Sequence, residues 1–268
     1  MRLPENFSFS QQNLQDYADC RYRFLLKYVR GIEWPAIESE PVLIQEARME
    51  LGQQFHRMVQ QYFSGVDPSL LATSIQSPEL AAWWQEFMAL DLQHIPGVKV
   101  PEKTISIPFV GYRLTAKFDL LVVSPEGNYS IFDWKTSGVL PKANHLLSRL
   151  QSIVYPYVLQ TWISRTTKDD NPPSEIEMIY WYPSHPTLPF SFNYSVDHYS
   201  RDENHLSGLV NEIINREEEG FDRTPEQSKC RFCRYRSLCG RGISAAIFES
   251  GSDEPIDGSA FDLDFDAL

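Results

Sequence analysis

A change in residue pattern between positions 104 and 136 most constrains the fold of this chain. The segments TISIPFV (104–110), YRLTAKFDLLVV (112–123) and YSIFDWKT (129–136) are rich in β-branched and aromatic residues, and the turn sequence SPEGN separates the last two. Segments of this kind joined by short turns predict three consecutive strands in a meander. The core must therefore be built around a sheet.

Apolar residues at helical spacing lie on both sides of this predicted sheet. They predict one or two helices after an N-cap at Ser8 or Ser10, and further helices over 42–63, 79–92, 145–163 and about 205–219. Pro156 should kink or interrupt the helix over 145–163. Two strands are expected over 175–183 and 188–196. The order helix, three strands, helix, strand predicts one α/β domain over residues 1–248, with a helical region before the core and a cysteine-rich segment after it.

The net charge of −12 is unevenly distributed along the 268 residues. Residues 249–268 contain seven acids and no Lys or Arg, so the remainder carries −12 + 7 = −5. We expect this acidic tail to be disordered, and the total charge does not exclude nucleic-acid binding by the rest of the chain. No run reaches the ~18 apolar residues of a membrane span, and the first ten residues lack a signal-peptide pattern. A cytoplasmic protein without membrane contact is expected.

The stretch IFDWKTSG carries the first candidate site. Residues two apart on a strand share a face, so Asp133 and Lys135 are expected to point together. Asp119 on the preceding strand can stand beside Asp133 and complete an oxygen-rich site for Mg²⁺ or Mn²⁺. Lys135 would orient or deprotonate water, or stabilise developing charge. A cross-strand ion pair without catalytic function is the alternative interpretation of an isolated Asp-x-Lys.

Two helices offer further candidate groups. His56 lies one turn after Gly52 on the same helix face, where the glycine would allow close approach, and His56 is a candidate third metal ligand. Gln151 and Tyr155 are also one turn apart and could hydrogen-bond a phosphate or fix Lys135. Ordinary core or surface roles remain open for each. Glu102, before the first strand, could add another acid or be a solvated surface residue.

These motifs together resemble the RecB-like branch of the PD-(D/E)XK nuclease superfamily, which includes nuclease domains of bacterial recombination complexes and CRISPR-adaptation exonucleases. The resemblance covers roughly residues 5–243, with Ala116 where a glycine is common. It implies an αβββαβ restriction-endonuclease-like core, an active metal site and exonuclease action on single-stranded DNA in repair, recombination or defence. The family motifs match, in chain order, Gly52 and His56, then Asp119, then Asp133 with Lys135 and Thr136, then Gln151 with Tyr155.

Four cysteines suggest a second metal centre. Their pattern does not by itself distinguish zinc from an iron-sulfur cluster, because both accept four thiolates. The resemblance implies a four-iron cluster, although Arg21 replaces the proline that often follows the first cysteine. Such a centre would join the two ends of the domain and have a structural role. The ligands would be Cys20, Cys230, Cys233 and Cys239.

The segment around the last three cysteines is basic and contains aromatic residues. It is interpreted either as a path for single-stranded DNA or as a solvated rim around the metal centre. The residues proposed to contact DNA are Arg231, Arg234, Tyr235 and Arg236.

The final segment AFDLDFDAL alternates acids with apolar residues. It resembles the acidic tail of bacterial single-stranded-DNA-binding proteins, and it could recruit a repair partner, occupy the protein's own DNA channel or merely solubilise the chain. The sequence contains no phosphate-binding loop of the Gly-x-x-x-x-Gly-Lys-Ser/Thr type, so a helicase activity would come from a partner. The alternative to an enzyme is a non-catalytic scaffold that binds DNA through its metal centre and basic segment.

Overall fold

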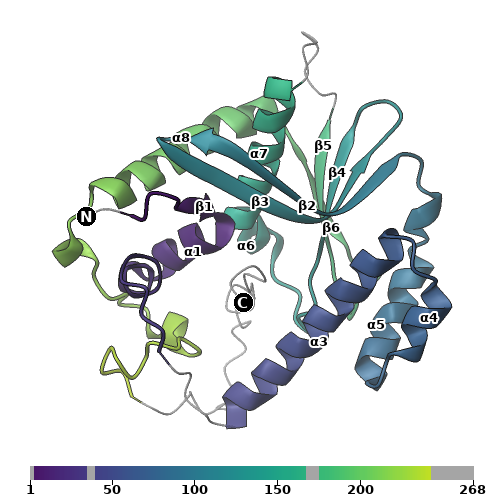
Figure 1. Cartoon of the computed structure of the whole chain (residues 1–268), viewed down its shortest axis with the longest axis horizontal. Coiled ribbons are helices and arrows are strands. Elements are labelled where there is room, and N and C mark those ends of the chain that lie inside the picture. Colours follow the sequence, from purple (N-terminus) through teal and green to yellow (C-terminus); the bar gives the residue numbers. More distant parts are fainter. Residues whose placement is uncertain (1–2, 35–39, 167–174, 243–268) are drawn as a thin grey trace.

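Six strands form one mixed sheet with helices on both faces (Figure 1). The computed structural model describes residues 3–34, 40–166 and 175–242, so the acidic tail at 249–268 lies outside the described residues. The α/β class predicted from the sequence is confirmed. In the described part of the chain, no helix is both long enough and apolar enough to cross a membrane. The strands are β1 (Ser8–Ser10), β2 (Val98–Phe109), β3 (Tyr112–Val123), β4 (Tyr129–Trp134), β5 (Ile176–Trp181) and β6 (Phe190–Tyr194).

Strand β3 is the centre of the sheet because three other strands pair with it. One edge of β3 pairs with antiparallel β2 from Tyr112 to Val123. The opposite edge pairs with β1 over residues 113–115 and with β4 over residues 120–123. Residues 116–119 are therefore left without a strand partner on that edge, and the sheet opens there. Beyond β4, strand β5 is parallel and β6 is antiparallel.

The helices cover the sheet in two layers (Figure 1). Helix α7 packs on one face with α1 and α8 beside it, and the side chains between them form the α7-side core. Helix α3 covers the other face with α4 and α5, forming the α3-side core, which is rich in tryptophan and phenylalanine. The helices are α1 (Gln11–Asp19), α2 (Arg21–Phe24), a π turn (Leu25–Val29), α3 (Glu40–Phe63), α4 (Pro68–Thr73), α5 (Pro78–Ala89), α6 (Ala143–Ser148), α7 (Leu150–Thr166) and α8 (Val196–Asn215), with short 3₁₀ turns at Leu92–His94, Glu218–Gly220 and Gln227–Cys230.

The helix expected over 145–163 is interrupted, but not at Pro156. Pro156 lies inside α7, and the break falls at Arg149, whose ψ of 142° ends α6. Burial of α7 between the sheet and its neighbouring helices offsets the hydrogen bond that the proline removes. The Ser152 hydroxyl donates to the Leu146 carbonyl at 2.5 Å and joins the two helices across the break.

Two element boundaries also differ from the prediction. Helix α8 begins nine residues before the expected His205, because Ser195 and His198 form a capping box at its N-terminus. Histidine is not the usual Glu or Gln partner in this motif, so the residue pattern indicates this helix start only weakly. Strand β2 begins at Val98, six residues before the predicted first strand, and this extension contains Glu102.

The C-terminal segment of the described chain returns to the N-terminal helices. The Tyr22 amide donates to the Asp222 carbonyl at 3.1 Å, and the Tyr235 hydroxyl donates to the Ile32 carbonyl at 2.8 Å. The Trp34 indole N–H also donates to the Ser237 hydroxyl at 2.8 Å. Protein contacts thus fasten the two ends of the domain together independently of any metal.

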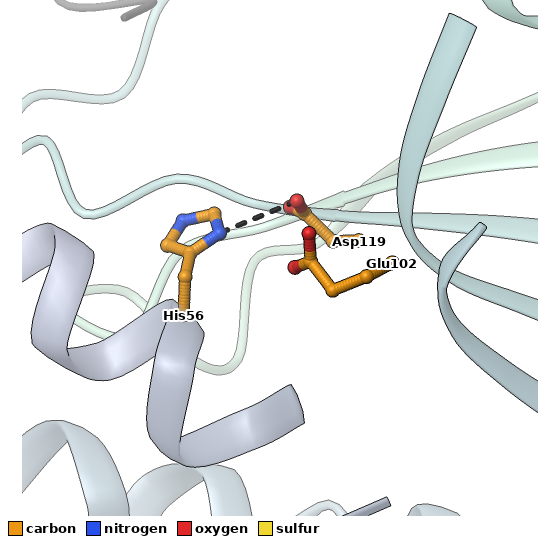
Figure 2. Close-up of side chains that lie close together, drawn as sticks. All are labelled: His56, Glu102 and Asp119. Atoms are coloured by element: carbon orange, nitrogen blue, oxygen red, sulfur yellow. Dashed lines mark ion pairs between the residues drawn. The ribbon is translucent and has the colours of Figure 1, made fainter. Parts of the chain in front are cut away.

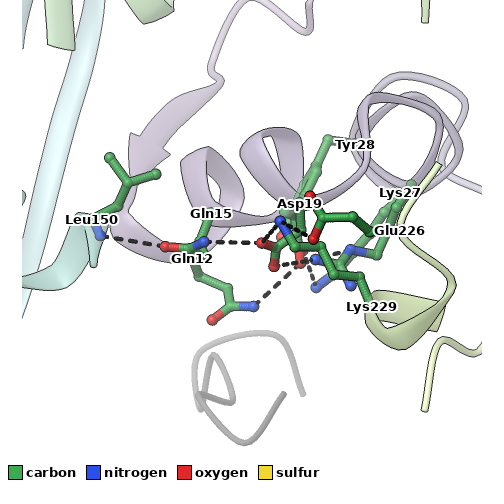
Figure 3. Close-up of polar contacts among 10 residues, drawn as sticks. Gln12, Gln15, Asp19, Lys27, Tyr28, Leu150, Glu226 and Lys229 are labelled. Atoms are coloured by element: carbon green, nitrogen blue, oxygen red, sulfur yellow. Dashed lines mark hydrogen bonds and ion pairs between the residues drawn. The ribbon is translucent and has the colours of Figure 1, made fainter. Parts of the chain in front are cut away.

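Buried carboxylates of α1 reinforce this junction (Figure 3). Asp16 accepts from the Tyr28 hydroxyl at 2.7 Å and pairs with Arg23 at 3.0 Å. Asp19 pairs with Arg23 at 2.9 Å and with Lys229 of the C-terminal segment at 3.5 Å. Carboxylates buried this deeply are tolerated only because cations and donors surround them. The network therefore couples α1 to the cysteine-rich segment.

Replacing Asp16→Ala should lower the free energy of unfolding by about 3 kcal/mol, because it leaves the largely buried Arg23 guanidinium short of a counter-ion. Urea denaturation followed by circular dichroism measures this change. Asp91→Asn is the control, since the Asp91 side chain is 64% exposed, its ion pair with His94 lies at the surface, and Asn also tolerates the left-handed backbone at this position. The control should change stability by about 0.5 kcal/mol or less. Equal effects of the two variants would contradict a structural role for the buried network.

Candidate functional site

The site begins with a distortion shared by β2 and β3. Phe118 packs in the α7-side core, but Leu120, two residues later, packs in the α3-side core. In a regular strand these residues would share a face, so the alternation changes phase at Asp119. The β2–β3 register is the same before and after this point and places Glu102 opposite Asp119. Glu102 has a φ of +51°, a left-handed conformation rare for a non-glycine residue.

Three side chains from separate elements converge at this distortion. His56 points from α3 toward Asp119 on β3 and Glu102 on β2 (Figure 2). One potential ligand atom from each lies within 4.8 Å of the other two. Nδ1 of His56 is 3.3 Å from Oδ1 of Asp119. One imidazole and two carboxylates in this arrangement can hold a divalent cation.

Asp119 also replaces a missing main-chain contact of the sheet. Pairing between β3 and β4 ends at Leu120 and Phe132, where the strands diverge. Just beyond, the amide of Trp134 donates to Oδ2 of Asp119 at 2.8 Å. A buried amide without a partner costs about 1–3 kcal/mol, so this carboxylate stabilises the opened sheet. Its second oxygen remains directed toward His56.

Asp133 and Lys135 lie together at the end of β4, as the sequence spacing predicts. Nζ of Lys135 is 2.9 Å from Oδ2 of Asp133, and both side chains are largely buried. The Gln151 amide on α7 donates to Oδ1 of Asp133 at 2.6 Å. The lysine amide donates to the Trp181 carbonyl at 2.9 Å, which fixes the backbone after β4. This arrangement holds an ammonium group beside the three converging ligands.

The candidate ligand and amide residues are not all placed as expected. The three-residue group contains Glu102 and not Asp133, whose carboxylate contacts Lys135 and Gln151. The ring of Tyr155 lies edge-on against Phe118 at 5.3 Å in the α7-side core. Gln151 contacts the Asp-x-Lys strand through its hydrogen bond to Asp133.

Charge crowding shifts the pKa values of all three converging groups. Burial lowers the pKa of His56, but the carboxylates of Asp119, Asp133 and Glu102 outweigh burial and the net pKa is raised. Burial, aided by Asp119, raises the pKa of Glu102. Burial acts to raise the pKa of Asp119, but His56 and the Trp134 amide outweigh it and the net pKa is lowered. A bound cation would relieve this crowding and would displace protons from the site.

Gly52 allows α3 to approach the strand that carries Asp133 and Lys135. A methyl group at Gly52 would lie 2.6 Å from Oγ1 of Thr136, far inside normal contact distance. Because Gly52 and His56 are one turn apart, this close approach also sets how far His56 reaches over the sheet. The helix and the Asp-x-Lys-Thr segment therefore pack so closely that a side chain at position 52 would displace Thr136.

The sequence profile of the PD-(D/E)XK nuclease superfamily matches residues 8–240. This match spans the three strands of the site, the helix that carries His56 and all four cysteines. The chain belongs to the PD-(D/E)XK nuclease superfamily. It is thus a member of a nuclease superfamily, and its mixed sheet, opened between β3 and β4, agrees with that assignment.

Solved structures add evidence on the fold alone. A candidate exonuclease from Eubacterium rectale aligns with a TM-score of 0.50 and 12% identity, over 78% of this chain and 80% of that chain. The protein SSO0001 aligns over 74% of this chain and 95% of its own, at 12% identity and a TM-score of 0.36, which is too low to support any argument. No curated protein sequence matches this nuclease-superfamily chain significantly.

The four cysteines of this PD-(D/E)XK chain line a single pocket between its two ends. Burial raises the pKa of the Cys233 thiol to about 11, and burial also raises the pKa of Cys239. An Arg241 N–H donates to Sγ of Cys230 at 3.0 Å. Four thiols and several cations around one pocket fit an anionic thiolate-bound metal centre. The residues of the pocket wall are Cys20, Arg23, Arg223, Lys229, Cys230, Cys233, Tyr235, Arg236, Cys239 and Arg241.

The expected DNA contacts of the same segment need correction at Tyr235. Tyr235 is 2% exposed and donates to the Ile32 carbonyl, so its ring is not available to stack on a base. Arg236 is also committed, since its Nε donates to the Arg241 carbonyl at 2.8 Å. Arg234 is exposed, with Nε donating to the Trp34 carbonyl, and Arg231 is half-buried. Tyr235 and Arg236 therefore line the cysteine pocket, and Arg234 is the exposed member of the four residues expected to contact DNA.

Replacing Gly52→Ala should destabilise this PD-(D/E)XK chain by about 1–3 kcal/mol, because the new methyl group displaces Thr136. Thermal or urea denaturation measures the change. Gly208→Ala is the matched control: Gly208 lies within α8 with open space around it, and this change should stabilise by up to about 1 kcal/mol. Adding Thr136→Ala to Gly52→Ala should restore most of the loss. Failure of that rescue would show that the close approach is not the cause.

Proposed function

We propose that this protein is a divalent-metal-dependent deoxyribonuclease. The observation that carries the proposal is the convergence of His56, Glu102 and Asp119 within 4.8 Å beside the Asp133–Lys135 pair. One imidazole nitrogen and carboxylate oxygens are donors that Mn²⁺ accepts, and the carboxylates also suit Mg²⁺. Asp133 is proposed as a further ligand because its Asp-x-Lys motif resembles that of RecB-like nucleases. Membership of a nuclease superfamily supports this assignment.

The side chains have separable roles in phosphodiester hydrolysis. A divalent ion supplies Lewis-acid stabilisation of phosphate oxygens and a lower pKa for bound water. Lys135, whose ammonium pairs with Asp133 at 2.9 Å, would orient the attacking water or stabilise the developing negative charge. Gln151 holds Asp133 by its 2.6 Å hydrogen bond and so keeps the carboxylate next to Lys135. The Trp134 amide holds Asp119 in the same way.

We include exonuclease action with a preference for single strands in the proposal, within repair, recombination or defence. The motif resemblance to RecB-like nucleases supports these finer assignments. Tyr155 belongs to the same motif and is proposed to support Gln151 from within α7. A helicase or repair-protein partner is proposed to supply unwinding. Arg234, which is exposed, and Arg231 remain proposed backbone contacts, and Arg236 would act by shaping the segment.

The proposed nuclease is tested by digesting end-labelled single- and double-stranded DNA with Mg²⁺ or Mn²⁺. Asp119→Asn and Lys135→Ala should each lower kcat by at least about 10²-fold, because one removes a ligand charge and the other the adjacent cation. Asp91→Asn, at an exposed position just before the 3₁₀ turn Leu92–His94, is the control and should retain activity. Wild-type activity in the Asp119 and Lys135 variants would place the reaction elsewhere. DNA binding without cleavage on any substrate or metal would favour the non-catalytic scaffold.

The role of Glu102 is tested in the same assay by titrating the metal. Glu102→Gln keeps the size of the side chain but removes one charge from the group of three. The Mn²⁺ concentration at half-maximal activity should rise about 10–100-fold. Calorimetry with Ca²⁺ gives an activity-independent measure of the same loss of affinity. An unchanged metal requirement would return Glu102 to a structural role, namely its ion pair with Lys117 at 3.1 Å.

We also propose that Cys20, Cys230, Cys233 and Cys239 hold a four-iron cluster with a structural role. All four line one pocket. The cationic wall suits an anionic thiolate-bound centre. The resemblance to RecB-like nucleases supports the cluster over zinc.

Anaerobically purified protein should be brown and contain about four irons and four sulfides per chain. Cys233→Ser should lose most of this iron and should loosen both ends of the domain together, which limited proteolysis would detect. Ser228→Ala, an exposed position in the same segment, should retain the iron. Colourless protein with stoichiometric zinc would contradict the cluster and establish the zinc alternative.

A further inference from the structure

The face of the β2–β3 hairpin that carries Asp119 is divided into two halves at this residue. On one side of Asp119, Leu120 and Val122 pack in the α3-side core. On the other side, toward the hairpin turn, Phe118 and Ala116 pack in the α7-side core, so their neighbours in the strand point to the α3 side. This half of the hairpin runs away from α4 and α5 (Figure 1). Its α3-side face carries polar residues, some of them exposed.

We name this polar half the outer strip. It begins beside the facing residues Glu102 and Asp119 of the candidate metal site and follows β3 to Arg113, six residues away. At about 3.3 Å per residue, the strip is about 20 Å long. Its residues, from β1, β2 and β3, are Ser8, Thr104, Ser106, Arg113, Thr115 and Lys117.

The outer strip carries two cations and no acid. Residues 103–118 contain no Asp or Glu, within a chain of net charge −12. Lys103, the third cation of this stretch, faces α7, where its ammonium lies 6.0 Å from the centre of the Trp162 ring. Arg113 is exposed, and within the described ranges of the chain it forms no ion pair with an acid. Its guanidinium donates to the hydroxyl and the carbonyl of Ser106 at 2.7 and 3.0 Å, which orient the cation without neutralising it.

The hydroxyl groups of the outer strip donate in one direction. Thr115 donates to the Ser106 hydroxyl at 2.9 Å, so Ser8 is the donor in its 2.7 Å contact with Thr115. Ser106 thus accepts from both Thr115 and Arg113, which occupies its two lone pairs. Among the residues that the structure describes, no acceptor receives the Ser106 proton. This half-buried hydroxyl is therefore a donor for an oxygen atom of a ligand.

Lys117 links the outer strip to the candidate metal ligands. Its ammonium is 3.1 Å from Oε2 of Glu102, and its side chain is 32% exposed. Glu102 is also one of the three converging ligands. A divalent cation that draws on the Glu102 carboxylate would weaken this ion pair. More of the Lys117 charge would then act on a negative group beside the metal.

We propose that the outer strip binds backbone phosphates of the DNA strand that enters the candidate catalytic site, with Lys117 nearest the metal and Arg113 at the far end. The inference rests on the proposed nuclease function and names the surface that holds the substrate. Arg, Lys and Ser side chains are typical phosphate contacts and do not read sequence. A length of about 20 Å corresponds to about six nucleotides at a rise of 3.4 Å. Binding along the strip is therefore independent of sequence.

The first experiment measures binding of a labelled single-stranded oligonucleotide in Ca²⁺ by fluorescence anisotropy, without cleavage. Lys117→Gln and Arg113→Gln should each weaken binding about five- to tenfold and reduce the slope of log K against log[salt] by about 0.7. Lys117→Arg keeps the charge and should keep the slope. Arg165→Gln, at an exposed cation in the last turn of α7, is the control and should stay within about twofold. An unchanged slope in either Gln variant of the strip, or an equal loss in the control, would overturn the proposal.

The second experiment separates a phosphate contact from a structural role of Lys117, using calorimetry with Mn²⁺ and no DNA. Lys117→Gln removes the cation that competes for Glu102, so Mn²⁺ binding should tighten about fivefold while DNA binding weakens. Arg113→Gln should leave the Mn²⁺ affinity within about twofold. Damage to the fold would weaken both kinds of binding. A Lys117→Gln variant that loses affinity for Mn²⁺ as well as for DNA would therefore contradict the phosphate contact.

The inference and the proposed nuclease function fail in different ways. Cleavage of DNA by the wild type, with an unchanged KM in both Gln variants of the strip, would overturn the inference alone. The expected losses of DNA affinity in Ca²⁺, without cleavage by the wild type in Mg²⁺ or Mn²⁺, would overturn the nuclease function and leave the strip as a DNA-binding surface.

Discussion

The divergence of β3 and β4 at Asp119 is the constraint on which the rest of the site depends. The two strands pair up to Leu120 and Phe132 and then separate, and the next amide, that of Trp134, bonds to a carboxylate and not to a main-chain carbonyl. One oxygen of Asp119 thereby replaces a sheet contact while the other faces His56. Asp119 is thus a candidate catalytic residue and also part of the sheet. Its carboxylate lets the sheet open without leaving the buried Trp134 amide unpaired.

The opening matters because both helical layers reach it. Helix α3 approaches from one face through Gly52 and brings His56, while α7 approaches from the other and brings Gln151. A closed sheet would keep these groups apart on opposite sides. The opening lets an imidazole from one layer and an amide from the other act on carboxylates that lie side by side. The chemistry is therefore located where the sheet is least regular.

Much of this arrangement follows from sequence periodicity, and the exceptions have physical causes. The pairing of Asp133 with Lys135 depends only on strand spacing, and the hairpin brings Asp119 near them. The sequence left Glu102 open between a further acid of the site and a solvated surface residue, because its position depends on the β2–β3 register and on a left-handed backbone angle that no local pattern encodes. Tyr235 resembled a base-stacking residue, but the segment folds back on the N-terminal helices and buries it. Local patterns identify strand partners; they do not identify which surface the chain returns to cover.

The return of the C-terminal segment onto α1 and α2 has a consequence for biosynthesis. Cys20 leaves the ribosome 210 residues before Cys230, an interval on the order of 20 s at typical rates of translation. During that interval Asp19 has Arg23 as a counter-ion but not Lys229, and the Ile32 carbonyl lacks the Tyr235 hydroxyl that later donates to it. The N-terminal helices are thus the first segment to be synthesised but among the last to gain all of their contacts. The nascent protein must hold its N-terminal helices against the growing sheet, through contacts such as that of Gln15 with the Leu150 amide, until the far end of the chain arrives.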